Sequence, residues 1–103
     1  MDRKQIAIDF AKSLNHPEIE KIILFGSVAR GEDNKDSDID ILIVVKEKED
    51  EYKIKRDIYD KIMDIVLEKE EVISTIITSL NYFNKHNNNA FYGEIKKEGI
   101  IIL

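Results

Sequence analysis

The stretch that decides the fold runs from residue 21 to residue 45 and reads KIILFGSVARGEDNKDSDIDILIVV. It opens with a short apolar run rich in branched side chains, which predicts a buried strand that stops at Gly26. Residues 38–45 alternate in a way that predicts a second strand, whose first two aspartates project to the same side. Between them, Ser27 to Arg30 is expected to form a single helical turn, and residues 32–37 a charged loop of turn formers.

The rest of the chain divides into helices and strands by the period of its apolar residues. Apolar positions in steps of three and four predict helices, whereas runs of β-branched residues predict strands. By these criteria we expect helices over 2–14, 51–70, 79–85 and 91–97, and strands over 72–78 and 100–103.

Residues 62–67 leave an alternative open. They could instead form a strand, with the long helix ending near Asp60, although the helical reading is favoured. Either arrangement predicts an α/β (α+β) protein with a mixed sheet of about four strands and helices packed mainly on one face.

Composition narrows the class of protein. A chain of 103 residues with 43% hydrophobic and 36% charged residues is expected to form one domain, residues 1–103, with one core. No stretch is apolar enough for a membrane helix, so a cytoplasmic protein is expected. The absence of cysteine excludes disulfides, thiolate metal sites and a cysteine nucleophile. The net charge of −5 makes a nucleic acid an unlikely partner.

Two polar clusters in the deciding stretch predict chemistry. A glycine where a strand becomes a helix lets a ligand approach the backbone, and the free N–H groups of the helix start favour phosphate, so Gly26 and Ser27 are candidate phosphate ligands. Asp38 and Asp40 are placed side by side on a strand, where their oxygens suit a hard cation such as Mg²⁺. The pairing predicts a metal between the protein and a triphosphate.

In their order and spacing, these residues resemble the signature of the polymerase β-like nucleotidyltransferase superfamily, in its minimal subgroup. The resemblance rests on Gly26 and Ser27, on residues 29–31, and on residues 37–40 with the apolar run behind them. It is tight over residues 20–45, and the ending over residues 91–100 is similar more loosely.

The resemblance implies transfer of a nucleoside monophosphate, AMP from ATP, to an acceptor hydroxyl. It implies that Gly26 and Ser27 hold the triphosphate, that Asp38 and Asp40 ligate Mg²⁺, and that Arg30 lies near the phosphates or braces the loop. Members of the subgroup are often encoded beside a helical HEPN-type toxin and act as its antitoxin, some by attaching AMP to a toxin tyrosine. A HEPN-type partner protein is therefore expected.

The superfamily's third carboxylate has no clear counterpart in the sequence. If the next strand is residues 72–78, the corresponding position holds Ser74; if residues 62–67 form that strand, Asp64 becomes the third ligand and general base. Without a third carboxylate, the chain could be an antitoxin or interaction module that binds nucleotide and acts by contact alone.

An aminoglycoside-modifying type of transferase is disfavoured, because no second domain is expected to bind such an acceptor. The apolar terminus, residues 100–103, could also pair with a second copy as a homodimer.

Overall fold

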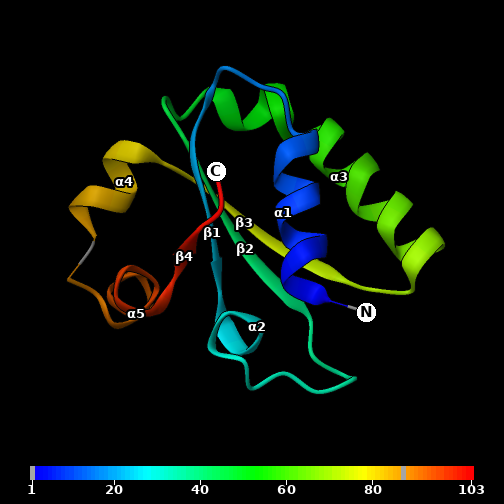
Figure 1. Ribbon diagram of the computed structural model, residues 1–103. Helices are drawn as coiled ribbons and strands as arrows, with labels where there is room; N and C mark the ends of the chain where they lie inside the picture. The colour runs from blue at the N-terminus through cyan, green and yellow to red at the C-terminus, as the bar shows by residue number, and fades with distance from the viewer. Residues whose placement is uncertain (1, 87) are drawn as a thin grey trace.

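The computed structural model describes residues 2–86 and 88–103, and Figure 1 shows the arrangement of its elements. In chain order these are α1 (Arg3–Ser13), β1 (Ile19–Phe25), α2 (Gly26–Arg30), β2 (Ile39–Val45), α3 (Asp50–Lys69), β3 (Ile73–Ser79), α4 (Leu80–Lys85), α5 (Ala90–Glu98) and β4 (Ile100–Ile101).

The four strands form one mixed sheet in the order β3-β2-β1-β4. Strand β1 is antiparallel to both β2 and β4, whereas β2 and β3 are parallel. Parallel neighbours need a crossover connection, and α3 supplies it. Strand β3 is consequently one edge of the sheet and the short β4 is the other.

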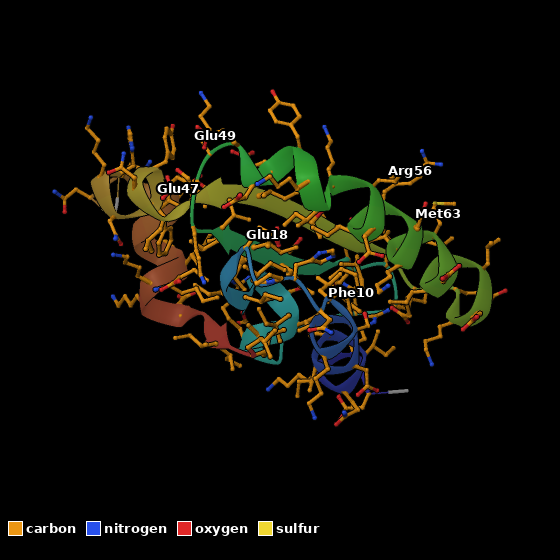
Figure 2. All side chains as sticks on the ribbon, turned by 90° about the horizontal axis from the view of Figure 1, so that it is seen from above. Phe10, Glu18, Glu47, Glu49, Arg56 and Met63 are labelled. Carbon is orange, nitrogen blue, oxygen red and sulfur yellow. The ribbon has the colours of Figure 1, made fainter. Side chains whose placement is uncertain are left out.

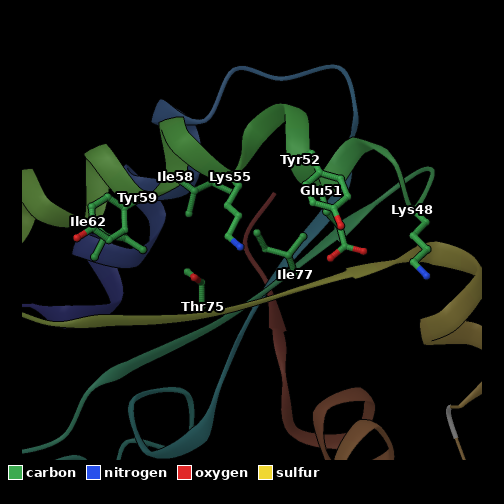
Figure 3. A pocket seen from close by; sticks show the side chains of 9 residues that line it. All are labelled: Lys48, Glu51, Tyr52, Lys55, Ile58, Tyr59, Ile62, Thr75 and Ile77. Atoms are coloured by element: carbon green, nitrogen blue, oxygen red, sulfur yellow. The ribbon is translucent and has the colours of Figure 1, made fainter.

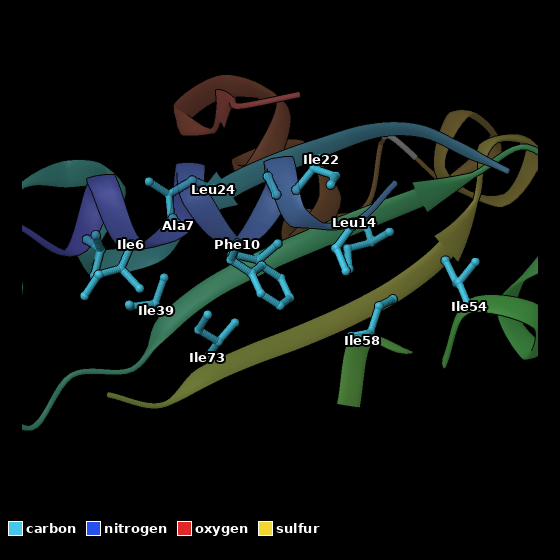
Figure 4. Packing of buried hydrophobic residues seen from close by; sticks show 14 of the residues in the cluster. Ile6, Ala7, Phe10, Leu14, Ile22, Leu24, Ile39, Ile54, Ile58 and Ile73 are labelled. Carbon is cyan, nitrogen blue, oxygen red and sulfur yellow. The ribbon is translucent and has the colours of Figure 1, made fainter. Parts of the chain in front are cut away.

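Helices cover both faces of the sheet. The two long helices, α1 and α3, lie on one face, and the shorter α4 and α5 lie on the other, as Figure 1 shows. The first face holds the larger core, where Phe10 of α1 and Ile58 of α3 pack on inward-facing strand residues such as Ile39 (Figure 4). On the second face, Phe83 and Ile95 pack against residues that include Leu42.

The long helix α3 removes the alternative strand at residues 62–67. It continues to Lys69 and ends at Glu70, which adopts a left-handed conformation with φ of 55° and donates its N–H to the carbonyl of Val66. Two of its residues, Ile54 and Ile58, are buried one helical turn apart.

The element order and the sheet confirm the predicted α/β class with a mixed sheet of four strands. Among the residues described here, no helix has the length and apolar character needed to cross a membrane.

We expect Phe10→Ala to lower the free energy of unfolding by about 3–5 kcal/mol, because it removes a large buried ring and leaves a cavity. The Phe10 side chain is 2% exposed and lies between the helices and the sheet in Figure 2, whereas Arg56 and Met63 project outward from α3. Urea denaturation would measure the change. Leu67→Ala is the matched control, since Leu67 is 76% exposed, and it should cost less than about 0.5 kcal/mol. Equal losses in the two variants would contradict this account of the core.

Candidate active site

Asp40 is placed by strand pairing at the end of the sheet where β1 turns into α2. It is the second residue of β2, and it lies opposite Phe25 of β1 and Ser74 of β3. Side chains alternate along a strand, so Asp40 shares the face of Leu42, which is the face covered by α4 and α5. Asp38 lies just before the strand begins and is exposed.

The carboxylate of Asp40 lies against the backbone of Gly26. A Cβ atom on Gly26 would fall 2.2 Å from Oδ2 of Asp40, and Gly26 has a φ of +75°, which other residues rarely adopt. Glycine is thus required here for two independent reasons. Gly26 is also the first residue of α2, and Ser27 follows it in the chain.

The ionised form of Asp40 is destabilised in the folded protein. Burial raises the pKa of its carboxyl group above the ordinary value of 3.8, and the negative charge of Asp38 raises it further, while Arg30 acts in the opposite direction. Two neighbouring carboxylates, one of them partly desolvated, favour a bound cation. Oxygen ligands of this kind suit Mg²⁺, which is commonly held by one or two carboxylates together with substrate phosphates. The residues therefore fit the predicted metal.

Arg30 braces α2 against α5. Its Nε donates to Glu32 at 2.5 Å, and its Nη1 forms a longer contact of 3.4 Å with Glu98 at the end of α5. The hydrogen bond to Glu32 is the main cause of a raised pKa for the guanidinium, followed in the same direction by the bond to Glu98. The expectation for Arg30 is a place near the phosphates or a bracing of the loop; its bond to Glu32 contacts the first residue of that loop, and its positive charge acts on Asp40.

The third-carboxylate position is occupied by Ser74. Strand β3 pairs Ser74 directly with Asp40, as the favoured reading of the sequence predicts. Asp64, the alternative, is instead an exposed residue of α3 that lines a groove with Ile6 and Phe10 of α1, on the opposite face of the sheet. Within residues 2–86 and 88–103, no group of three or more His, Asp or Glu side chains is placed to hold a metal. The hypothesis that Asp64 completes the site is therefore corrected: the helix carries it away from Asp38 and Asp40.

Arg3 is a residue of the site region that sequence reasoning missed. It donates to Glu71 at 2.8 Å and to Asp33 at 3.0 Å, and it also donates to the backbone carbonyls of Asn34 and Lys35. It thereby fastens the loop that leads into Asp38 to the start of β3. These partners are 30 to 68 residues away in the chain, so no local pattern could have revealed the contact.

A separate hollow of about 400 Å³ lies between α3 and the edge strand β3, shown in Figure 3. Its lining includes Tyr52, Lys55 and Tyr59 from the helix and Thr75 from the strand. Thr75 points to the face opposite Asp40, because strand neighbours alternate. The aspartates do not line this hollow.

The fold and this arrangement define a class of enzyme, the nucleotidyltransferases. The chain belongs to the polymerase beta nucleotidyltransferase family, whose sequence profile matches residues 8–103. Two relatives from Methanocaldococcus jannaschii support the membership. The provisionally named protein adenylyltransferase MJ0604 is 38% identical over 92% of this chain and 89% of its own length. MJ0141, which has the same kind of name, is 31% identical over 97% of this chain and 98% of its own length.

Solved structures share the fold. A provisionally named nucleotidyltransferase from Sulfolobus solfataricus has a TM-score of 0.53 at 23% identity, and the match covers 94% of this chain and 76% of that one. A toxin-antitoxin structure with AMP-PNP has a TM-score of 0.61 at 16% identity, and the match covers 100% of this chain and 73% of that one. The predicted minimal nucleotidyltransferase is thus confirmed in family and in fold, since the M. jannaschii relatives are scarcely longer than this chain.

We expect Asp40→Asn to raise the free energy of unfolding at pH 7 in the absence of divalent cations. A carboxyl group whose pKa is raised on folding binds protons more tightly in the folded state, so stability falls as pH rises from 3.8 through the raised pKa and stays lowered above it. The variant lacks this cost, and its advantage should vanish in acid, where the carboxyl group is protonated in both states. Urea denaturation at several pH values would measure the difference.

Asp60→Asn, at an exposed position on α3, is the matched control for this experiment. It should show no comparable gain at pH 7. An Asp40→Asn variant that is equally destabilised in acid and at neutral pH would contradict the electrostatic cost assigned to Asp40.

Proposed function

We propose that this protein transfers AMP from ATP to a hydroxyl group of a partner protein. The observation that carries the proposal is the contact between Asp40 and the Gly26 backbone, beside Asp38, in a chain of the polymerase beta nucleotidyltransferase family. Asp64 is not assigned a part.

In this proposal, each residue of the site has a defined task. Gly26 and Ser27 bind the triphosphate through backbone N–H groups and the serine hydroxyl. Asp38 and Asp40 would hold Mg²⁺, which supplies positive charge that neutralises the phosphates and the charge developing in the transition state. Arg30 keeps α2 in place through Glu98 and adds a positive charge close to Asp40.

The reaction exchanges a phosphoanhydride bond of ATP for a phosphoester bond to the acceptor. An oxygen of the acceptor hydroxyl attacks the α-phosphorus, the bond from that phosphorus to the bridging oxygen of the β-phosphate breaks, and pyrophosphate leaves. The position beside Asp40 holds Ser74 and offers no carboxylate to take the proton of the hydroxyl, which in this proposal passes to water. Loss of such a general base typically lowers a rate by about 10²- to 10⁴-fold, so slow transfer is expected.

Two similarities support a protein acceptor and an adenine nucleotide. The M. jannaschii relatives carry the name of protein adenylyltransferases, and the toxin-antitoxin structure with the same fold holds AMP-PNP. We therefore extend the proposal to an antitoxin that modifies a toxin, with a helical HEPN-type protein as the partner that the sequence resemblance implies.

A second function is favoured by Ser74. With two carboxylates at the site instead of three, the protein would bind nucleotide and inhibit its partner by contact alone. The two functions differ in whether label moves from the nucleotide to the partner, and both predict a stable complex.

We expect the purified protein, incubated with α-labelled ATP, Mg²⁺ and the product of the adjacent gene, to transfer label slowly to that product. The double variant Asp38→Asn, Asp40→Asn should lose the transfer, because the cation loses both of its carboxylate ligands. Gel electrophoresis and mass spectrometry would locate the label. A complex that forms without any label on the partner would contradict transfer and favour inhibition by contact.

We expect Ser74→Asp to raise the transfer rate by about 10²- to 10⁴-fold, because it places a carboxylate beside Asp40 that can accept the acceptor's proton. Ser74→Asn is the matched control, since it has nearly the same shape and cannot act as a base. Single-turnover kinetics would measure both variants. Equal rates in the two would show that proton abstraction does not limit the reaction.

A further inference from the structure

A cleft of about 270 Å³ opens between α2 and α5, directly beside the site. It shares Gly26 and Arg30 with the site, and its remaining walls come from Phe25 and from α5. Strand pairing places Phe25 opposite Asp40, with both side chains on the face that α5 covers. A ligand bound at Asp40 therefore reaches the cleft without crossing the sheet.

The walls of the cleft are aromatic and apolar. The rings of Phe25 and Phe91 meet edge to face with centroids 5.8 Å apart, and the buried Ile95 of α5 lines the same cleft. Phe91 lines the cleft and is 46% exposed, so part of its ring is accessible to a ligand. Glu94 adds a carboxylate to the same lining, where it can accept hydrogen bonds.

We propose that this cleft binds the base of the nucleotide whose phosphates lie at Gly26 and Asp40; the inference rests on the proposed function. A flat ring that stacks on Phe91 would cover its exposed area, and an exocyclic amino group on that ring could donate to Glu94. The cleft suits a nucleobase in both respects. The ion pair between Arg30 and Glu98 holds α2 and α5 at the two sides of the ring.

The test compares Mg-ATP with Mg-tripolyphosphate, which has the phosphates and no base. We expect Phe91→Ala to weaken the binding of Mg-ATP about tenfold, as the loss of one base–aromatic stack does, and to leave the binding of Mg-tripolyphosphate unchanged. Isothermal titration calorimetry would measure both ligands. Phe91→Tyr should retain the affinity for ATP, since it keeps the ring.

Tyr52→Ala is the matched control, because Tyr52 is an exposed aromatic residue on α3 in the other hollow, and it should change neither affinity. Thermal unfolding checks that Phe91→Ala is folded. Phe91→Leu, which keeps an apolar side chain and loses the ring, gives a second measurement and should also weaken ATP.

Three results would overturn the proposal. An ATP affinity of Phe91→Ala within twofold of the parent would remove the base from this cleft. Unchanged ATP binding with reduced transfer to the partner would assign the cleft to the acceptor. Tripolyphosphate binding that is indifferent to the Asp38→Asn, Asp40→Asn double variant would instead remove the proposed phosphate site, and with it the basis of the inference.

Discussion

The close approach of the Asp40 carboxylate to the Gly26 backbone is the contact on which the rest of the site depends. The antiparallel register of β1 and β2 puts Asp40 opposite Phe25. The next residue of the chain is Gly26, where α2 begins, so the carboxylate and the turn lie together. Only a residue without a Cβ atom leaves room for the carboxylate at that turn. One pair of strands thus delivers the acidic group and the start of α2 to the same point, and Arg3 fastens the loop that joins them.

Most of this architecture could be predicted from the sequence because its signals are local. The glycine turn, the alternation after Asp38 and the β-branched run that contains Ser74 each lie within a few residues. Residues 62–67 are ambiguous from sequence, since a short apolar run suits a strand or a helix. In the folded chain α3 continues through them to Lys69, and Ile62 and Ile65 pack against the core. The contacts from Arg3 to Glu71 and from Arg30 to Glu98 each span 68 residues, and only the folded chain brings those partners together.

The negative charges of Asp38 and Asp40 repel each other and lower the free energy of unfolding where no cation offsets them. Asp40 is partly desolvated and next to another negative charge, and folding gains nothing from ionising it. Under the proposed function, a bound cation with its nucleotide would remove this repulsion only in the folded state and would stabilise the fold by mass action. Ligand binding would then offset the destabilising charge of Asp40, and carboxylates with raised pKa values are common at functional sites.

With Ser74 at the third-carboxylate position, this chain offers no general base there, and the proposed reaction depends on the positioning of the acceptor hydroxyl. A missing base slows proton removal, yet a hydroxyl held next to the α-phosphorus within a stable complex gains from proximity, and effective molarities of about 10⁵ to 10⁸ M are reached when the geometry is right. A protein that modifies one partner molecule once needs few turnovers. Under the proposed function, two carboxylates and a glycine turn can therefore suffice, provided that the partner supplies the orientation of the acceptor hydroxyl.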